Sequence, residues 1–588
     1  MQKTRSILCI LVLSLAQGLI AAPADDFNTL LDEVWEWQLA EYPMFASQLG
    51  DRRYNDRWTD QSLGAIARRQ QQTREFLQRL YAIDRSALGG DDQLNYELFR
   101  RQLQDRVDSF AFNGHRIPFN QRGGVQNLDN STNSLRFATT QDYDDWLARL
   151  GKIDEVIAQT IELAEKGRKS GQVSPRVLMQ RIPDQIAAQL VEDPELSPFY
   201  KVFAEMPDSV PDEDQERLRA LARETITKTV LPAYRKLDKY FSRTYLPASR
   251  ESIGLSELPN GSAWYEHLAH EFTTTQMSPD EIHRLGLDEV RRIRDEMQMI
   301  IDDLDFGGSF QDFLVFLRTD PQFYFDNPDD LYEAYLATSK RIDPELVQLF
   351  GKLPRMPYGV KPIPDSIAPD TTTAYYSRPA ADGSRAGTYW VNLYKPEVRP
   401  KYEIEVLSVH EAMPGHHLQI ALQQELGDMP NFRRFSGFTA FVEGWGLYSE
   451  SLGHDLGLYK DPYSQFGALT YEMWRAVRLV VDTGIHYKGW TRQQAIEFFQ
   501  DNAAKTEFDI INEIDRYIGM PGQALAYKIG QLKIKSIREN AERTLGENFD
   551  VRAFHDELLG GGALPLDILE QHMDAWLESQ LQERRASH

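Results

Sequence analysis

The sequence predicts a mainly α-helical protein of two lobes, and three observations support this. Apolar residues recur at i, i+3 and i+4 along most of the chain, which is the spacing of an amphipathic helix. Only one stretch has the alternation of a convincing strand. The length of 588 residues exceeds what one simple hydrophobic core accommodates. We therefore expect an N-terminal helical lobe over 25–255 and a catalytic helical lobe over 256–588.

The first 24 residues are expected to be a signal peptide that is removed on export. Lys3 and Arg5 give it a positive start, and Ile7 to Ile20 is an apolar run too short to span a bilayer comfortably. Ala22-Pro23-Ala24 supplies small residues for cleavage. No later apolar run is long enough for a membrane segment, so the predicted location is the periplasm.

Composition narrows the chemistry of the exported protein. The single cysteine, Cys9, lies within the predicted signal peptide and in a context unlike a lipid-anchor site. This excludes disulfides, thiolate catalysis and cysteine-bound metals. Without Lys3 and Arg5 the chain has 63 basic and 89 acidic residues, a net charge near −26. Such a charge argues against nucleic acid and anionic membranes as partners, and the oligomeric state stays open.

The helical pattern begins directly after the signal peptide. Ser278 and Pro279 form a standard helix start, with Ser278 as the N-cap and Pro279 in the first helical position. Mixed charges on the opposite helix faces indicate solvated surfaces. The ranges predicted to be helical before residue 354 are 26–49, 62–83, 92–110, 141–168, 212–242, 279–304 and 329–350.

Residues 354–399 are rich in Pro and Gly and interrupt the helical pattern. Within them Gly387 to Leu393 alternates β-branched and aromatic residues, which predicts a strand in a small β-hairpin or sheet near 370–395. In one interpretation its exposed edge pairs with an extended peptide substrate, which Tyr389 and Asn392 contact. In the other, the hairpin only covers the helical core.

The functional prediction rests on His410-Glu411-Ala412-Met413-Pro414-Gly415-His416-His417, which holds three of the twelve histidines. A later helical segment, Phe441 to Tyr448, carries Glu443 among apolar neighbours. Two histidines, a glutamate beside the first and a glutamate on a later helix are the ingredients of a zinc site with two histidines and one glutamate. Surface imidazoles at a helix N-terminus are the alternative.

The histidine spacing differs from His-Glu-x-x-His, in which both rings reach one metal from adjacent turns. In an unbroken helix neither His416 nor His417 would share a metal with His410. Pro414-Gly415 permits a bulge, and two extra residues would bring His416 into place, whereas three would bring His417. The predicted metal ligands are His410, His416 and Glu443, with His417 as the alternative second ligand.

The helices resume from residue 463 to the end. Arg475 and Arg478 share one helix face, and Tyr527 and Lys528 lie on a helix that starts at Pro521-Gly522. Cations in an acidic protein are suited to bind a substrate carboxylate, although pairing with the abundant Asp and Glu is the plainer alternative. His267 and His270 form a weaker second metal candidate, with packed or surface histidines as the alternative.

These motifs resemble the bacterial family known as domain of unknown function 885. The resemblance is carried by His410 to Gln419, Phe441 to Tyr448, Arg478 to His486, Pro521 to Tyr527 and the segment from Tyr375 through Asn392. The family looks distantly similar to thermolysin-like metallopeptidases such as carboxypeptidase Taq. That similarity implies a helix-built molecule around a deep central channel. The chain departs from those peptidases in its histidine spacing.

The predicted function is a zinc-dependent periplasmic peptidase that hydrolyses short peptides with about one Zn²⁺ per chain. Glu411 is the predicted general base. Tyr527 is the predicted donor to the oxyanion, with His486 and His417 as further candidates. The residues predicted to bind a C-terminal carboxylate are Arg475, Arg478 and Lys528.

Two other functions remain open. A metal-dependent amidase or esterase acting on a non-peptide substrate would use the same bond-breaking groups. A catalytically inactive helical periplasmic binding protein would have lost metal binding through the Pro-Gly insertion. Replacement of Glu411 by Gln separates an enzyme of either kind from the binding protein. An enzyme would keep its metal and lose turnover, whereas a binding protein would be unaffected.

Overall fold

The computed structural model describes residues 23–365, 368–435 and 437–587. Within them the fold is mainly α-helical with one small three-stranded sheet, as predicted. The prediction of a signal peptide falls almost wholly outside the described residues. None of the helices in these ranges combines the length and apolar composition that a membrane span requires.

The helices up to residue 248 are α1 (Pro23–Glu41), α2 (Pro43–Leu49), α3 (Leu63–Tyr81), α4 (Gly90–Ser109), α5 (Thr140–Leu150), α6 (Ile153–Lys169), α7 (Arg176–Met179), α8 (Ile182–Ala187), α9 (Lys201–Ala204), α10 (Asp212–Thr225), α11 (Leu231–Tyr240) and α12 (Leu246–Ala248). Two π-helical segments, Ile226–Val230 and Phe241–Tyr245, join α10, α11 and α12. The helix predicted over 212–242 is therefore part of one longer continuous run.

The later helices are α13 (Gly261–Thr273), α14 (Pro279–Asp303), α15 (Phe310–Thr319), α16 (Pro328–Ile342), α17 (Ile404–Glu411), α18 (His416–Glu425), α19 (Asn431–Arg434), α20 (Thr439–Ser451), α21 (Pro462–His486), α22 (Arg492–Gln500), α23 (Glu507–Gly519), α24 (Ala526–Leu545), α25 (Val551–Gly560) and α26 (Leu566–Ser587). α14 begins as predicted. The N–H of Glu281 donates to Oγ of Ser278 at 3.3 Å, and the carboxylate of Glu281 accepts from the N–H of Ser278 at 2.8 Å.

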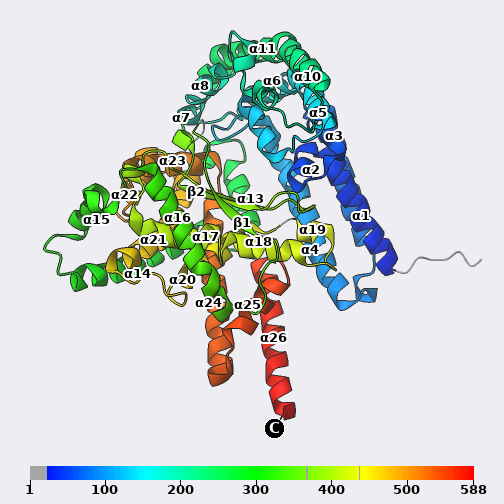
Figure 1. Ribbon diagram of the computed structural model, residues 1–588. Coiled ribbons are helices and arrows are strands. Elements are labelled where there is room, and N and C mark those ends of the chain that lie inside the picture. The colour runs from blue at the N-terminus through cyan, green and yellow to red at the C-terminus, as the bar shows by residue number, and fades with distance from the viewer. Residues whose placement is uncertain (1–22, 366–367, 436, 588) are drawn as a thin grey trace, which may run out of the picture.

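The two groups of helices lie side by side and contact each other. Figure 1 shows α1–α11 as an arch at the right and top, with α14–α23 at the left and centre and α24–α26 extending below. Nδ2 of Asn120 donates to the carbonyl oxygen of Gly519 at 3.0 Å. Arg181 forms an ion pair with Asp515 at 2.6 Å. The division into lobes at residue 255 stays a prediction.

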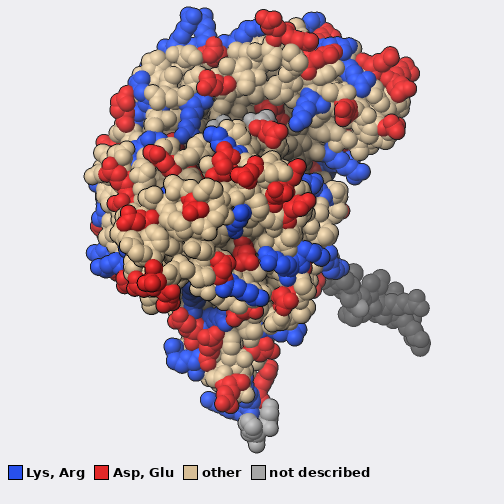
Figure 2. All heavy atoms as spheres, turned by 60° about the vertical axis from the view of Figure 1, so that its left-hand side comes forward, with Lys and Arg blue, Asp and Glu red and all other residues tan. Residues whose placement is uncertain are grey.

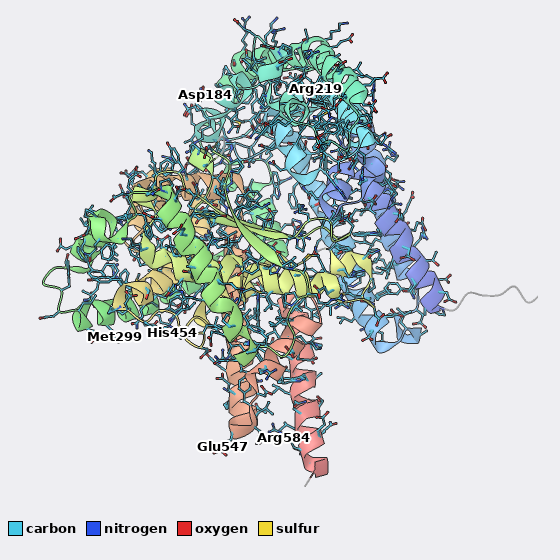
Figure 3. All side chains as sticks on the ribbon, in the orientation of Figure 1. Asp184, Arg219, Met299, His454, Glu547 and Arg584 are labelled. Atoms are coloured by element: carbon cyan, nitrogen blue, oxygen red, sulfur yellow. The ribbon has the colours of Figure 1, made fainter. Side chains whose placement is uncertain are left out.

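The surface carries charges of both signs. Figure 2 shows acidic and basic side chains interleaved over the face turned toward the viewer. Glu547 and Arg584 lie at the far tip of the extension formed by α24 and α26 (Figure 3). Nη2 of Arg584 donates to the carbonyl oxygen of Asn548 at 2.8 Å, so the ends of the two helices contact each other at this tip.

α21 is the central helix of the core. Every residue from Met473 to His486 is buried. α14 packs closely against it, because Gly286 has no side chain and a Cβ there would lie 2.7 Å from Cβ of Leu479. Polar side chains on so buried a helix need partners, since a buried polar group without one is costly.

α20 and α24 cross at two glycines, which brings their backbones together. A Cβ on Gly530 would lie 1.9 Å from the carbonyl oxygen of Ala440, and a Cβ on Gly444 would lie 2.5 Å from Cα of Gly530. Only glycine permits this approach. The crossing fixes the segment of α20 that carries Glu443.

The sheet contains β1 (Tyr358–Pro362), β2 (Ala374–Ser377) and β3 (Gly387–Val391) in the order β1-β3-β2. β3 pairs in parallel with β1 and antiparallel with β2. The predicted strand exists, but the prediction that it offers an exposed edge is wrong, because both of its edges are paired. Among the described strands, β2 has the free edge on that side of the sheet.

Candidate metal centre

A break between two helices places His410 and His416. α17 ends at Glu411 and α18 begins at His416, and the connection contains a cis peptide bond between Met413 and Pro414. Glycine is required at 415, because a Cβ there would lie 1.9 Å from the carbonyl oxygen of His410. The predicted bulge thus takes the form of a helix break. It leaves the two imidazole rings with centroids 4.7 Å apart.

Glu443 of α20 completes a cluster of three potential metal ligands. Its Oε2 lies 3.4 Å from Nε2 of His416 and 3.8 Å from Nε2 of His410. One ligand atom from each side chain lies within 4.8 Å of the others. Ligand atoms about 2.0–2.1 Å from a tetrahedral zinc ion lie roughly 3.3 Å apart. Oε2 of Glu443 is buried and has no hydrogen-bond partner in the described part of the chain, so the cluster fits a cation at this point.

The other nitrogen of His410 is held by Glu450. Nδ1–H of His410 donates to Oε1 of Glu450 at 2.7 Å, and Nη2 of Arg475 lies 3.3 Å from the same oxygen. This is the carboxylate–histidine arrangement that orients metal-binding histidines. Gly446 makes room for the ring, because a Cβ there would lie 2.8 Å from Cε1 of His410.

The charges in the cluster are strongly coupled. Burial lowers the pKa of His410, but the carboxylates of Glu443 and Glu450 outweigh burial and raise it to about 9. Burial raises the pKa of Glu443, but His416 and His410 hold it well below its usual range. A protonated His410 therefore balances the buried carboxylates, and a bound metal would displace its proton.

His417 does not face this cluster. Its Nε2–H donates to the carbonyl oxygen of Met356 at 2.9 Å, and its Nδ1 accepts from the hydroxyl of Tyr376 at 2.8 Å. Burial lowers its pKa to about 4. Because both ring nitrogens are occupied, the geometry excludes His417 as the second ligand and as a donor to the substrate. It ties α18 to β2.

The three-residue cluster lines a cavity of about 360 Å³. Glu411 lines it beside His410, is 8% exposed, and makes no hydrogen bond or ion pair within the described ranges. Thr372 to Tyr376, which includes most of β2, lines another part of the wall. The cavity therefore combines a free carboxylate, the ligand cluster and an unpaired strand edge.

Tyr527 lines the same cavity. Its phenol oxygen accepts hydrogen bonds from Nη2 of Arg516 at 3.1 Å and Nε2 of Gln523 at 3.5 Å. Both contacts use the lone pairs of the oxygen, so the hydroxyl proton can be donated to a molecule in the cavity. The predicted role as a donor is compatible with this geometry.

Arg475 and Arg478 line the cavity, but each has protein partners. Arg475 pairs with Glu450 and donates through Nη1 to the carbonyl oxygen of Tyr471 at 3.2 Å. Arg478 donates through Nε to the hydroxyl of Tyr517 at 2.8 Å and pairs with Glu513 at 3.2 Å. Nε of Arg475 and Nη1 of Arg478 are both buried and have no hydrogen-bond partner among the described residues. Arg475 also holds Glu450, so each arginine combines protein partners with one unused donor.

His486 and Lys528 lie outside the lining of this cavity, contrary to prediction. Nδ1 of His486 accepts from the N–H of Leu255 at 3.0 Å, and its Nε2–H donates to a backbone carbonyl at 2.9 Å. Lys528 is fully buried and pairs with Glu472 at 2.7 Å and Glu289 at 2.9 Å. Both side chains stabilise the core, because burial on these helices requires partners for every polar atom.

Tyr389, on the central strand β3, and Asn392, directly after it, are completely buried and also lie outside the lining. Tyr389 packs edge-on against Tyr335 with ring centroids 5.9 Å apart. Nδ2 of Asn392 donates to the carbonyl oxygens of Ala368 at 2.8 Å and Thr372 at 3.2 Å. Asn392 therefore holds the loop that leads into β2 and does not contact a ligand directly.

Several residues that line the cavity or hold a side chain of the cluster were not predicted from the sequence. Glu450 follows Glu443 by two helical turns on one face, a spacing that is visible in the sequence. Arg122 gives no such indication, because it comes from the N-terminal group of helices and meets the cavity only in the folded chain. The other cavity residues of this kind are Tyr375, Tyr376, Glu513 and Arg516.

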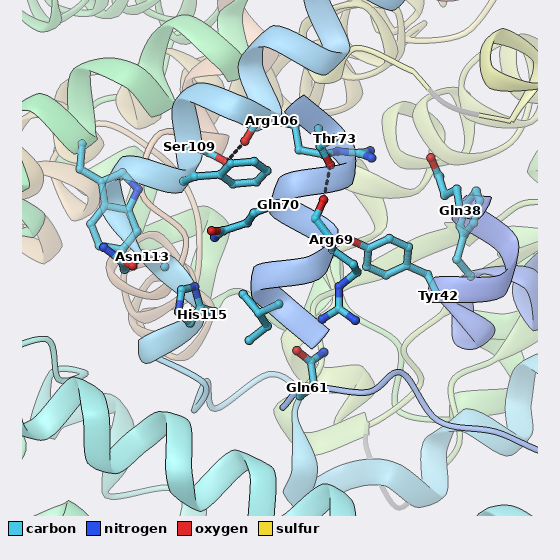
Figure 4. A pocket seen from close by; sticks show the side chains of 15 residues that line it. Gln38, Tyr42, Gln61, Arg69, Gln70, Thr73, Arg106, Ser109, Asn113 and His115 are labelled. Atoms are coloured by element: carbon cyan, nitrogen blue, oxygen red, sulfur yellow. Dashed lines mark hydrogen bonds between the residues drawn. The ribbon is translucent and has the colours of Figure 1, made fainter. Parts of the chain in front are cut away.

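A second cavity of about 580 Å³ lies among the N-terminal helices and α13. Figure 4 shows that Arg69 and Gln70 reach it from α3 and His115 from the segment after α4. None of the predicted site residues lines it. His267 lies 3.6 Å from Glu271 and packs on Phe112, and neither His267 nor His270 belongs to a metal-binding cluster in the described part of the chain.

The fold and the cluster define a large helical protein with a candidate metal centre. The family model of bacterial proteins of unknown function (DUF885) matches residues 43–573, so the chain belongs to that family, as its motifs predict. No curated protein matches the chain. The distant similarity to thermolysin-like peptidases stays a prediction.

The solved structures that are similar to this one include two bacterial proteins. A protein from Colwellia psychrerythraea, named a putative lipoprotein, is 29% identical over 95% of this chain and 100% of its own, with a TM-score of 0.88. A protein from Shewanella oneidensis, named a putative lipoprotein of unknown function, is 18% identical over 94% of this chain and 100% of its own, with a TM-score of 0.71. The second likeness is one of fold alone.

Proposed function

We propose that this chain is a zinc-dependent hydrolase that cleaves amide bonds in short peptides. The observation that carries the proposal is the buried Oε2 of Glu443. It has no hydrogen-bond partner among the residues that the structure describes, and it lies 3.4 Å from Nε2 of His416 and 3.8 Å from Nε2 of His410. His410, His416 and Glu443 would hold the ion. When bound, zinc lowers the pKa of a water molecule and polarises a carbonyl group.

The remaining steps belong to side chains of the cavity. Glu411, which makes no hydrogen bond or ion pair to any described residue, accepts a proton from the attacking water and later passes it to the leaving amine. Tyr527 donates its free hydroxyl proton to the oxyanion. The unpaired edge of β2 binds the extended substrate backbone. A cavity of about 360 Å³ suits a ligand of small-molecule size, which favours short peptides over folded proteins.

We also propose that the protein is exported to the periplasm. The pattern of residues 1–24 supports this, and two of the similar structures are named putative lipoproteins. Fractionation of cells that produce the full chain should place it outside the cytoplasm. N-terminal sequencing of the isolated protein should begin near residue 25. Recovery of an uncleaved chain in the cytoplasm would contradict the proposal.

The function is tested by metal content and peptide cleavage, measured on the same preparations. We expect about one zinc ion per chain by plasma mass spectrometry, lost in His410→Ala and Glu443→Ala. Glu411→Gln should keep the metal and lower turnover of a short-peptide library by at least about 100-fold. Glu405→Gln is the control. Glu405 lies on the same helix α17 as Glu411, but it pairs with Arg341.

The outcomes separate the alternatives. A wild-type chain that binds no metal after zinc is added back would refute the hydrolase. A metal-loaded chain that cleaves small non-peptide amides or esters but no peptides would support the amidase or esterase alternative. A chain that binds peptides without turnover, unaffected by Glu411→Gln, would support the binding protein.

A further inference from the structure

Arg122 reaches the cavity from the N-terminal group of helices. The two residues before it are anchored to α23, because Asn120 donates to the carbonyl oxygen of Gly519 at 3.0 Å and Gln121 donates to that of Asp515 at 3.1 Å. This fixes the backbone of Arg122 at the mouth of the cavity. Its guanidinium makes no ion pair or hydrogen bond to any described side chain, and it stays exposed to solvent. An arginine placed by its neighbours but left without a partner is suited to receive an anion.

The same end of the cavity carries an excess of positive charge. Arg478 and Arg516 share one carboxylate, that of Glu513, at 3.2 Å and 3.6 Å. Arg122 adds a further guanidinium on this side. Three cations face one carboxylate, so a bound anion would relieve their repulsion.

Hydrogen-bond donors at this end are also available. Nη1 of Arg478 is buried and finds no hydrogen-bond acceptor within the described ranges. The hydroxyl of Tyr527 accepts from Arg516 and keeps its proton free. A planar guanidinium matches a carboxylate through two parallel N–H donors. The unused donors therefore favour a carboxylate.

We propose that Arg122, Arg478 and Arg516 bind the C-terminal carboxylate of the peptide substrate, and that the N-terminal group of helices thereby completes the specificity site. This inference rests on the proposed hydrolase. The arginine end and the metal cluster line one cavity of about 360 Å³, so an anion at the arginines lies close to the bond that is cleaved. The enzyme would then remove residues from the C-terminus of a peptide. Arg122 acts as a specificity-determining residue.

The test uses the full chain with Glu411→Gln, so that substrate binds without being consumed. The probes are an N-acetylated dipeptide with a free C-terminal carboxylate and the same dipeptide as its C-terminal amide, and calorimetry measures both affinities. We expect the acid to bind about tenfold or more tightly than the amide. Addition of Arg122→Gln should remove most of this preference, whereas Arg122→Lys should retain part of it.

Arg181→Gln is the matched control. It removes an arginine that also joins the N-terminal helices to α23 through Asp515, but it does not line this cavity. It should preserve the preference for the acid. Equal affinity for acid and amide, an unchanged preference after Arg122→Gln, or no binding of either probe would overturn the inference.

Cleavage assays distinguish failure of this inference from failure of the proposed function. If wild type hydrolyses the amide as fast as the acid, the hydrolase stands and the carboxylate site is refuted. If the acid is preferred through Arg122 but neither probe is cleaved and no metal binds, the carboxylate site stands and the hydrolase is refuted.

Discussion

Nδ1 of His410 lies 2.7 Å from Oε1 of Glu450, and both side chains are almost fully buried. The hydrogen bond turns Nε2 of His410 toward Glu443. Arg475 lies 3.3 Å from the same carboxylate oxygen and helps to hold Glu450 in place. The orientation of a candidate metal ligand thus depends on a residue two helical turns beyond the third ligand.

We predict that Glu450→Gln weakens zinc binding by about 10- to 100-fold, because it removes the charge that orients His410 and raises its basicity. Competition with a chromogenic chelator measures the affinity. Glu405→Gln should leave it unchanged, since that carboxylate belongs to the same helix α17 as His410 but pairs with Arg341 near the surface. Equal affinities of wild type and Glu450→Gln would contradict the role of Glu450.

The neighbouring histidines offer a matched comparison. His416→Gln should abolish stoichiometric zinc binding, because it removes a ligand. His417→Gln should retain the metal, because both nitrogens of His417 are engaged by Met356 and Tyr376. Metal content of the two purified variants decides the matter. Loss of zinc in His417→Gln, with an unchanged circular dichroism spectrum, would show that the ligand assignment is incorrect.

The stability of the protein should depend on pH through Asp482. Burial raises the pKa of this carboxyl to about 7, although the hydroxyl of Tyr265 and the N–H of Gly522 donate to it. In the unfolded chain its pKa is about 3.9. The folded state therefore holds a proton that the unfolded state releases. This contribution is fully present below about pH 4 and is lost as the pH rises through 7, on the order of 4 kcal/mol in total.

Asp482→Asn cannot titrate, so its stability should lack this component. Chemical denaturation of wild type and variant between pH 5 and 8 measures the difference. Relative to the variant, the free energy of unfolding of the wild type should fall by up to about 1.4 kcal/mol per pH unit in this range. A difference that does not vary with pH would show that Asp482 has no raised pKa.

Lys528 should contribute to stability and not to substrate binding. Lys528→Met leaves the buried carboxylates of Glu472 and Glu289 with fewer partners and should lower the free energy of unfolding by about 3 kcal/mol. The KM of the folded variant should be unchanged, because Lys528 does not line the cavity. Lys228→Ala, which removes a largely exposed lysine, should leave the denaturation curve unchanged. A raised KM with normal stability would restore the predicted substrate role of Lys528.

Sequence patterns predicted elements better than they predicted the partners of side chains. Helical spacing located the long helices, and Ser278 marked the start of α14 correctly. The strand at 387 was found, but its parallel partner β1 lies in a Pro-rich segment without a strand pattern. The sequence therefore did not indicate that β3 has a partner strand at each edge. Arg475 and Lys528 illustrate the same limit. The residue type alone does not show whether a basic side chain binds a ligand or pairs with a carboxylate of the protein.

Taken by itself, the sequence determined the helical class, the family motifs and the residue types of a His-His-Glu site, because these depend on local spacing and composition. Only the tertiary structure decided which histidine faces Glu443, since a helix break rotates His416 toward the cluster and leaves His417 bound to Tyr376. It also decided that Arg122 joins the cavity, because residues far apart in the chain meet only when their helices pack. Candidate metal ligands are distinguished from polar side chains of the core by their distances in the folded chain, and the periodicity of the sequence does not contain these distances.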